Sequence, residues 1–389
     1  MKKETQVIKI QSEKTHNREN STPLYLTSSF CYEDAAQGKD LFDGTISGNI
    51  YSRFSNPTVQ EFIDKICVLE ELEDGVATAT GMAAVFACFG AHLAAGDHLV
   101  SSKALFGSSH QIITQILVKW GIEYTYVDAS APKETWEAAI KPNTRMIYLE
   151  TPSNPGLEIV DLEMIGELTQ KHNLIYCIDN CFATPILQVP SRYGANLVLH
   201  SATKFMDGQG RVLGGVVVGT KELMEKVRFF TRQTGPALSP FNAWILSKSL
   251  ETLSLRMERH CSSALKLATA LEKVEGVKQV NYPFLDSFGQ KDLAKKQMSA
   301  GGALITFELE GGFERVVRFS KLLKVPSLTS NLGDSRTTIT NPFTTTHSKV
   351  PAADKYALGI YEGSMRVSVG LEDIDDLIED FTQAIVGSK

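Results

Sequence analysis

The chain has 389 residues, of which 43% are hydrophobic and 22% charged, and its formal net charge is −6 at pH 7. These values are typical of a globular protein with two domains, and the absence of a long basic run argues against nucleic acid as a partner. The N-terminus lacks the apolar region of a signal peptide, and the longest apolar run, near 82–95, is too short to span a membrane, so we expect a cytoplasmic protein that does not enter a membrane.

The sequence contains 6 cysteines, at positions 31, 67, 88, 177, 181 and 261. In a chain without a secretion signal, most of them are expected to be reduced thiols of the core. Cys177 and Cys181 have the spacing of a metal-binding pair, but neither a second pair nor a nearby histidine completes such a site. We therefore predict that the protein binds no metal.

Residues 1–50 are polar and rich in turn formers, so this arm is expected to wrap another part of the fold or a neighbouring subunit. From residue 57 onward, the pattern alternates between helix and strand. Helices are predicted at 58–71, 81–93, 108–120 and 161–172, and strands at 75–79, 98–101, 123–127, 144–149, 173–178 and 197–199. This alternation is typical of a mostly parallel, doubly wound α/β sheet, which we assign to a large domain at 51–245.

A change of composition follows at Pro236 and Pro240. A long helix predicted from Ala243 is a candidate connection between the domains. Beyond it, helices are predicted at 264–275, 313–323 and 374–386, and strands at 277–282, 303–308 and 365–369. These elements predict a smaller C-terminal α+β domain at 246–389.

Two of the predicted strands end in polar residues that suit one cofactor. The run at 197–199 leads through Ser201 and Thr203 to Lys204, and the run at 173–178 ends at Asp179. Neighbouring strands of an α/β sheet end at one edge, where ligands bind. Pyridoxal 5′-phosphate (PLP) requires a lysine for a Schiff base, an acid that keeps the pyridine nitrogen protonated, and donors for its phosphate.

Each of these features has a simpler explanation when it is taken alone. A lone lysine is most often a surface residue, Asp179 is a good helix N-cap, and Ser201 and Thr203 are also turn formers. Gly81 and Met82 close a strand-to-helix turn that suits a phosphate, but a plain tight turn explains them equally well. Their joint occurrence is the more specific signal.

Other polar residues stand in unusual surroundings. Tyr51 and Arg53 lie in the polar arm and are of the types that bind phosphate. Arg366 lies inside an apolar strand, where it needs a salt-bridge partner or a substrate carboxylate. Asn154 follows a strand and either faces a ring oxygen or belongs to a proline-framed turn. The glycine-rich stretch 208–214 lacks the spacing and position of a dinucleotide loop, which we exclude.

Together these stretches resemble the cystathionine gamma-synthase-like family of PLP enzymes, which act in Cys/Met metabolism and have fold type I. The resemblance covers nearly the whole chain and is carried by Tyr51-Ser52-Arg53 with Asn56-Pro57-Thr58, Gly81-Met82, Glu150-Thr151-Pro152-Ser153-Asn154-Pro155, Asp179-Asn180, Ser201-Ala202-Thr203-Lys204 and Arg366-Val367-Ser368-Val369-Gly370-Leu371-Glu372. It implies PLP as the cofactor and a homotetramer, a dimer of dimers whose active sites are shared between subunits.

The resemblance also implies roles for the candidate residues. Lys204 would form the Schiff base with PLP, and Asp179 would pair with the ring nitrogen. The phosphate would be bound within one subunit by Gly81, Met82, Ser201 and Thr203, and from the neighbouring subunit by Tyr51 and Arg53. The substrate carboxylate would be held by Arg366, with Asn331 and Asn154 beside the substrate and Asn154 also at the PLP ring.

Within the family, the stretches 234–244 and 331–334 are similar to the sulfhydrylases. Phe106 stands where most members carry a tyrosine stacked on the PLP ring. Phenylalanine can still stack on this ring, but it lacks the phenolic hydroxyl of the tyrosine. Ser108 and Asn331 differ from residues typical of the lyases. These features imply γ-replacement on O-succinyl-L-homoserine by sulfide, giving L-homocysteine and succinate for methionine biosynthesis. Cysteine as the nucleophile, O-acetylhomoserine as the substrate, and a methionine or cystathionine gamma-lyase reaction stay open as alternatives.

Overall fold

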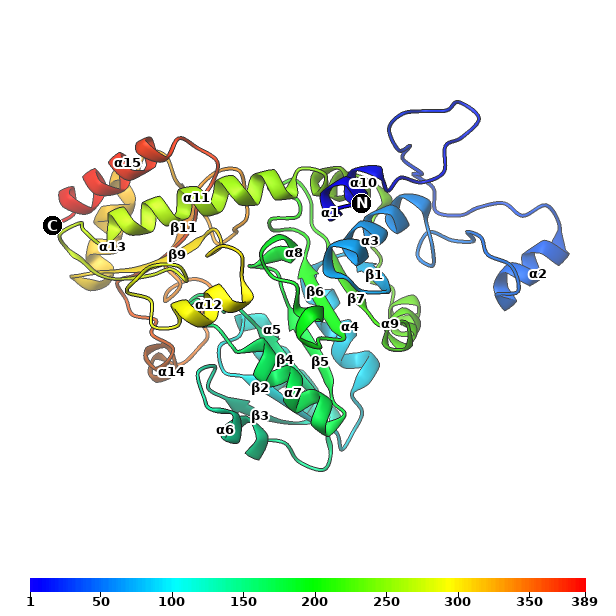
Figure 1. Cartoon of the computed structure of the whole chain (residues 1–389), viewed down its shortest axis with the longest axis horizontal. Helices are drawn as coiled ribbons and strands as arrows, with labels where there is room; N and C mark the ends of the chain where they lie inside the picture. The colour runs from blue at the N-terminus through cyan, green and yellow to red at the C-terminus, as the bar shows by residue number, and fades with distance from the viewer.

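The computed structural model describes residues 1–389, apart from the side chains of residues 354 and 357. Within this described chain, a large domain with a 7-stranded sheet adjoins a C-terminal domain with a 5-stranded sheet, and the two lie side by side in Figure 1. The large sheet has the order β1-β7-β6-β5-β4-β2-β3. Its strands are β1 (Asp74–Thr78), β2 (His98–Ser102), β3 (Glu123–Val127), β4 (Thr144–Glu150), β5 (Ile175–Asp179), β6 (Leu197–Ser201) and β7 (Gly215–Gly219).

The large sheet is mostly parallel and is covered on both faces, as predicted. Only β7 runs against its neighbours, since it pairs antiparallel with both β1 and β6. Ile147 and Leu149 of β4 pack on one face together with α3 (Pro57–Glu70) and α7 (Leu162–His172). Met146 and Tyr148 pack on the other face with α4 (Gly81–His92) and α9 (Lys221–Thr234). This alternation follows from the two-residue period of a strand.

The C-terminal domain is built on a mostly antiparallel sheet. Its strands are β8 (Val277–Asn281), β9 (Leu304–Leu309), β10 (Ser327–Leu328), β11 (Thr338–Thr340) and β12 (Ser364–Ser368), of which only the short pair β10–β11 is parallel. Its helices are α12 (Lys291–Gln297), α13 (Gly312–Leu322), α14 (Ala352–Ala357) and α15 (Ile374–Gly387). Phe307, Phe319 and Phe381 form the centre of its core, where β9 meets α13 and α15.

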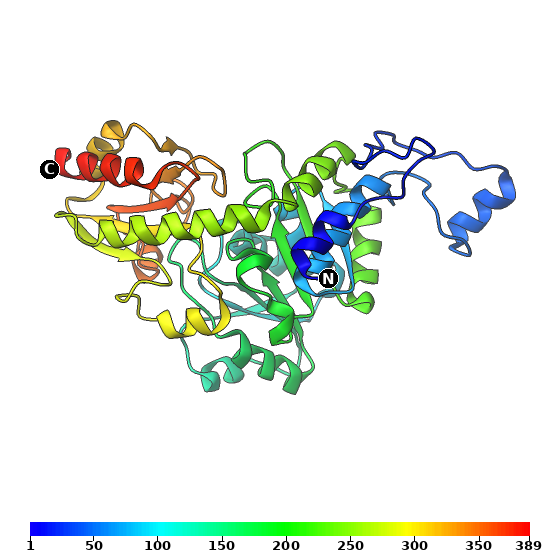
Figure 2. The same cartoon turned by 45° about the horizontal axis from the view of Figure 1, so that its top comes forward.

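Two consecutive helices join the domains. α10 (Pro240–Leu250) packs against α3 of the large domain, and α11 (Leu253–Leu271) packs against α15 of the C-terminal domain. Figure 2 shows α11 crossing from one domain to the other. The sequence predicted this connection but began it at Ala243, whereas α10 starts at Pro240, because proline suits the first turn of a helix and Ser239 caps it.

Some predicted helices differ from the structure. The helix expected at 108–120 divides into α5 (Gly107–Gln111), a π-helical turn (Ile112–Ile116) and a 3₁₀ turn (Leu117–Trp120). The helix expected at 264–275 is the second half of α11, which ends at Leu271. Cys31 is exposed rather than in the core, because it lies on the arm, away from either domain's apolar cluster.

The N-terminal arm contains helices that the sequence did not reveal. α1 (Lys3–Lys9) packs against α3, whereas α2 (Ala35–Asp43) lies at the end of a segment that extends away from the body of the molecule (Figures 1 and 2). The remaining short helices are α6 (Lys133–Ala138), α8 (Thr184–Leu187) and a 3₁₀ turn (Pro190–Tyr193). Among the described residues, no helix combines the length and the apolar character that crossing a membrane requires.

Candidate active site

The carboxyl ends of β4, β5 and β6 open into a cavity of about 400 Å³, which residues of the C-terminal domain also line. This volume lies in the range of small-molecule sites. The cavity contains most of the residues predicted from the sequence, namely Gly81, Met82, Phe106, Asn154, Asp179, Ser201, Thr203, Lys204, Asn331 and Arg366. The topology therefore brings together residues that lie as far apart in the chain as Gly81 and Arg366.

Asp179 stands at the end of a buried strand, next to a second carboxylate. Its Oδ1 accepts a hydrogen bond from the Cys181 N–H at 3.0 Å, and its partner in the β4–β5 register is Glu150. Burial raises the pKa of Asp179 well above its ordinary value, and the charge of Glu150 acts in the same direction. A cationic ring nitrogen at this position would compensate for both effects, which fits a protonated pyridine.

Lys204 lies in the turn that follows β6. Its N–H donates to the Ser201 carbonyl at 3.2 Å, and its Nζ donates to Asn331 Oδ1 of the C-terminal domain at 2.5 Å. Burial lowers the pKa of Lys204, and the positive charge of Arg366 adds to this effect. A lowered pKa increases the share of neutral amine, which is the form that attacks an aldehyde or takes up a proton.

The start of α4 fits a phosphate. Thr80 caps the Ala83 N–H at 3.1 Å, but the N–H groups of Gly81 and Met82 have no acceptor among the described residues. A Cβ at position 81 would lie 2.5 Å from the Cβ of Ser201, so glycine allows the end of β6 to approach the helix. Free amides, the helix dipole and a serine hydroxyl at one point form a site for an anion.

Thr203 lines the same cavity, but its hydroxyl is already engaged. Its Oγ1 accepts a hydrogen bond from the Gly214 N–H at 3.1 Å. The same hydroxyl donates its proton to the Gly214 carbonyl at 3.3 Å, so Thr203 would have to give up this bond in order to donate to a bound phosphate.

Arg366 is a buried cation without a carboxylate partner. It is 2% exposed, and its guanidinium donates from Nη1 to Asn154 Oδ1 at 3.0 Å and from Nη2 to the Ser330 carbonyl at 2.8 Å. Burial lowers its pKa to about 10, so it stays protonated at neutral pH. No carboxylate of the described side chains pairs with it, and its Nε has no hydrogen-bond partner among them. A buried unpaired charge is costly, which favours a ligand carboxylate over the salt-bridge alternative.

Glu150 is the main polar residue of the site for which no role was predicted from the sequence. Its Oε2 accepts from the Phe106 N–H at 2.7 Å, and its Oε1 accepts from Ser109 Oγ at 2.9 Å and from the Tyr148 hydroxyl at 3.2 Å. Burial raises the pKa of Glu150 to about 7. These bonds hold the Phe106 segment against the cavity. The position of Glu150 at the end of an apolar strand was the feature of the sequence that could have indicated this role.

Tyr51 and Arg53 lie outside the cavity of their own chain, as far as the described residues show. Tyr51 is 40% exposed and forms a β-bridge with Ser29 of the arm. The Arg53 guanidinium stacks 4.8 Å from the centre of the Phe54 ring and donates to the Arg232 carbonyl. Their assignment to the site of a neighbouring subunit stays a prediction.

Comparison with known protein sequences identifies the same family as the residues of the cavity. The Cys/Met metabolism PLP-dependent enzyme family matches residues 4–386. The chain is 42% identical over 382 residues to an O-succinylhomoserine sulfhydrylase of Pseudomonas aeruginosa, which covers 98% of this chain and 94% of that protein. It is also 42% identical over 366 residues to an L-methionine gamma-lyase of Fusobacterium nucleatum subsp. polymorphum, with 93% and 92% covered.

Solved structures show the same similarity. A Campylobacter jejuni protein that carries a pyridoxyl-lysine phosphate group superposes with a TM-score of 0.95 at 32% identity, covering 99% of this chain and 100% of that one. A cystathionine gamma-lyase of Lactobacillus plantarum, in complex with L-serine, superposes with a TM-score of 0.93 at 35% identity, covering 99% of both chains.

Proposed function

The chain belongs to the PLP-dependent enzymes of Cys/Met metabolism, and we propose that it replaces the succinyloxy group at Cγ of O-succinyl-L-homoserine by sulfide, so that the Cγ–O bond breaks and L-homocysteine and succinate are released. PLP is the cofactor of this family. The proposal rests mainly on one observation, the contact between Lys204 and Asn331 in a cavity that also contains Phe106. Asn331 and Ser108, which also lines the cavity, differ from the residues typical of the lyases, and Phe106 replaces the tyrosine that most members of the family carry.

The cavity suits PLP at each of its functional groups. The Gly81 and Met82 amides, with Ser201, would hold the phosphate, Asp179 would hold the ring nitrogen, and Phe106 would cover a face of the ring. Lys204 would hold the aldehyde carbon. When bound, PLP withdraws electrons from the bonds of the substrate α-carbon.

Each of the cavity residues has its own role in the proposed reaction. Arg366 binds the substrate carboxylate and so fixes the α-carbon beside Lys204. The Lys204 Nζ takes up the α-proton, and its lowered pKa keeps part of the amine neutral for this purpose. The Asn331 amide oxygen orients that amine. Asp179 remains ionised when a cation faces it and keeps the ring nitrogen protonated.

The reaction is tested by the products of three incubations. Purified holoenzyme is supplied with O-succinyl-L-homoserine together with sulfide, together with cysteine, or alone. We expect L-homocysteine with sulfide as the dominant product. Cystathionine as the preferred product would indicate cysteine as the nucleophile, and 2-oxobutanoate at saturating sulfide would indicate a lyase; either result contradicts the proposal. O-acetyl-L-homoserine in the same assay compares the two leaving groups.

A methionine gamma-lyase is the second candidate, because relatives with that name are as similar to this chain as the sulfhydrylases are. L-Methionine as the sole substrate separates the two. A sulfhydrylase should form little methanethiol and 2-oxobutanoate from it, whereas a lyase should form both in equal amounts.

We further propose that the active site is shared between subunits of a homotetramer. The projecting segment 11–55 exposes apolar side chains, including Leu26 at 68% and Phe42 at 58%, which water solvates poorly. Tyr51 and Arg53 lie in this segment, are of the types that bind phosphate, and lie outside the cavity of their own chain. A second copy of the chain would cover the segment and receive both residues.

A further inference from the structure

The segment from Lys204 to Gly214, here called the lysine loop, contains the glycine-rich stretch 208–214, whose spacing is not that of a dinucleotide site. It leaves the sheet after β6 and returns at β7, and the bond between the Gly214 N–H and Thr203 Oγ1, at 3.1 Å, closes its base. Lys204 at its start and Leu213 near its end both line the active-site cavity. The conformation of this loop therefore sets the position of two cavity residues.

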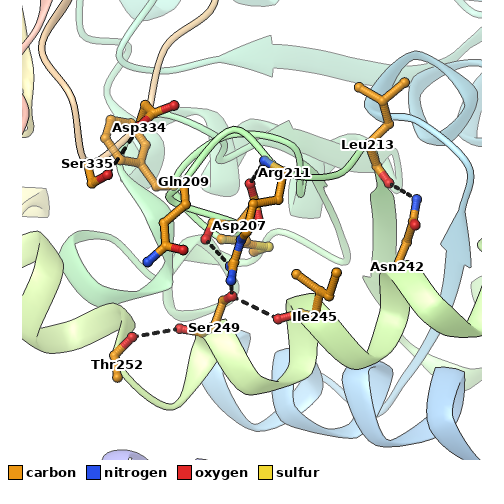
Figure 3. A network of polar contacts seen from close by, with 12 residues as sticks. Asp207, Gln209, Arg211, Leu213, Asn242, Ile245, Ser249, Thr252, Asp334 and Ser335 are labelled. Carbon is orange, nitrogen blue, oxygen red and sulfur yellow. Dashed lines mark hydrogen bonds and ion pairs between the residues drawn. The ribbon is translucent and has the colours of Figure 1, made fainter. Parts of the chain in front are cut away.

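An ion pair between the buried Asp207 and the half-exposed Arg211 stabilises the conformation of the loop. Asp207 is 1% exposed, and its Oδ2 accepts from the Arg211 N–H at 2.7 Å while its Oδ1 accepts from Arg211 Nε at 3.0 Å. Arg211 Nη2 also donates to the Asp207 carbonyl at 3.0 Å. Figure 3 shows Arg211 folded back over Asp207 in this way. Hydrogen bonds to charged groups are among the stronger ones in proteins.

Two arginines fasten the loop to the helices that join the domains. Arg211 Nη2 donates to Ser249 Oγ of α10, as seen in Figure 3. From α11, Arg256 donates through Nη1 to the Phe205 carbonyl at 2.5 Å and through Nη2 to the Met206 carbonyl at 3.3 Å. Phe205 and Met206 directly follow Lys204, so these bonds act on the backbone next to the lysine.

The far end of the loop is held as well. Asn242 of α10 donates from Nδ2 to the Leu213 carbonyl at 2.9 Å (Figure 3). From the C-terminal domain, the Ser335 N–H donates to the Gly208 carbonyl at 2.8 Å. The loop is thus bonded at both ends and in its middle to elements outside the large sheet.

The glycines of the loop are explained by these contacts. Gly208 and Gly210 have φ of +72° and +65°, a conformation that glycine adopts without strain. A Cβ at position 208 would overlap the Arg256 guanidinium, and one at 210 would lie 2.5 Å from Asp334 Oδ2. Glycine is therefore required for close packing against Arg256 and Asp334, and no nucleotide is needed to account for it.

We propose that Arg211 and Arg256 are positioning residues for Lys204, because they bond the backbone of the lysine loop to α10 and α11. α11 also packs against the C-terminal domain, which supplies Asn331 and Arg366. The two arginines thereby set the position of the Lys204 amine relative to the residues that meet the same substrate. This inference rests on the proposed role of Lys204 and deepens it.

The size of the expected effect follows from geometry. Displacing a catalytic group by about 1 Å is enough to reduce turnover by about 100-fold. Loss of the Arg256 bonds would free two carbonyls beside Lys204 while leaving Arg366 in place. The effect should therefore fall on kcat rather than on KM.

The test uses holoenzyme variants of α11 and of the loop. Arg256→Met removes the guanidinium, Arg256→Lys restores one donor, and Arg211→Met removes the second anchor at a half-exposed position. Arg259→Met is the matched control, since Arg259 lies one turn further along α11 and donates to the Glu372 carbonyl. Each variant is measured for kcat and KM, for the visible circular dichroism of the bound cofactor, and for hydrogen exchange in peptides covering 204–214.

We expect Arg256→Met to lower kcat by roughly 10- to 100-fold with KM changed less than about threefold. Its visible circular dichroism should change and its loop should exchange faster, Arg256→Lys should recover part of each effect, and Arg211→Met should show the same pattern more weakly. Arg259→Met should behave as the wild type.

A lower melting temperature with unchanged kcat, circular dichroism and loop exchange would show that the arginines are merely structural and would overturn the inference, as would a rise in KM at constant kcat. If Arg256→Met does not fold, Arg211→Met decides by the same criteria. The spectroscopic and exchange measurements need no substrate, so a wild-type enzyme that fails to use sulfide would refute the proposed function without affecting them.

Discussion

The cavity between the domains and the projecting segment 11–55 differ in whether the fold of one chain alone assembles and covers them. In the cavity, Lys204 and Arg366 each have defined hydrogen-bond partners, and Asp179 is held at the end of a buried strand. In the projecting segment, Leu26 and Phe42 are 68% and 58% exposed. One region is assembled by the fold of a single chain, and the other has surface that only another molecule would cover.

This difference separates two kinds of residue in the proposed site. The groups that would bind the PLP ring and the substrate come from strand ends and the C-terminal domain, and they meet without a partner subunit. The groups of the arm, Tyr51 and Arg53, do not reach the cavity of their own chain. We therefore expect substitutions in the two regions to have different effects. Substitutions in the cavity should abolish the catalysed reaction, whereas substitutions in the arm should weaken the binding of PLP.

The largest effect is expected from Lys204→Ala. Because the proposed proton transfer and cofactor attachment both depend on the Lys204 Nζ, kcat should fall by at least about 1,000-fold. Borohydride reduction followed by peptide mapping should place a pyridoxyl group on residue 204 of the wild type and on no residue of the variant. Lys321→Ala, which changes an exposed lysine of α13, is the control and should retain full activity. A tag on another lysine would contradict the assignment.

The cavity half of the site was largely predictable from the sequence, because its residues lie at the ends of apolar runs. Parallel strands end at one edge, so Asp179 and Lys204 had to meet once both runs were recognised as neighbouring strands. Glu150 also ends such a run, but its role depends on the Phe106 amide and the Ser109 hydroxyl, which reach it from α5. Sequence periodicity carries no information about such contacts.

The elements that the sequence did not reveal share a physical reason. β7 is a short apolar run between glycines, and it is antiparallel in a sheet that otherwise follows the alternation of strand and helix. α9 buries only Met224, Val227 and Thr231 along 14 residues, so its apolar stripe is narrow. In both cases the local pattern is compatible with the element, but the antiparallel direction of β7 and the face that α9 buries follow from tertiary pairing, which a local pattern does not encode.

The second prediction concerns the arm. The combined variant Tyr51→Phe and Arg53→Ala removes the groups proposed to bind the phosphate of a neighbouring subunit. Loss of charge-assisted hydrogen bonds worth about 1.5–3 kcal/mol should raise the dissociation constant of PLP by roughly 10- to 100-fold. Cofactor release during dialysis, followed by absorbance, measures this effect.

A matched variant makes this result specific. Tyr32→Phe changes another exposed tyrosine of the same segment, at 44% exposure, and should retain PLP as the wild type does. Equal retention of PLP by the double variant would remove the arm from the site. It would also mean that the cavity of a single chain is sufficient for the phosphate.

The smallest effect, on the free energy of unfolding, is expected for a substitution at the start of the arm. There an exposed ionic cluster fixes α1 to the large domain. Lys3 Nζ lies 2.9 Å from Glu71 Oε1, and Arg192 Nε donates to Glu71 Oε2 at 2.9 Å. Hydrogen bonding from Arg192, with a smaller contribution from Lys3, lowers the pKa of Glu71 to about 2. Since pairs of this kind are screened by water, Glu71→Gln should reduce the free energy of unfolding at pH 7 by less than about 1 kcal/mol.

The pH dependence of this small effect has a definite sign. A carboxyl whose pKa is lowered in the folded state takes up a proton more readily in the unfolded chain, so acid favours unfolding. The contribution of Glu71 should be complete above about pH 5 and should be lost as the pH falls towards 2. The difference in melting temperature between wild type and Glu71→Gln should accordingly narrow from pH 7 to pH 3, while PLP affinity at pH 7 stays the same. A loss of PLP in this variant would show that the anchored start of the arm and its projecting part act together, and the two regions could then not be treated as independent.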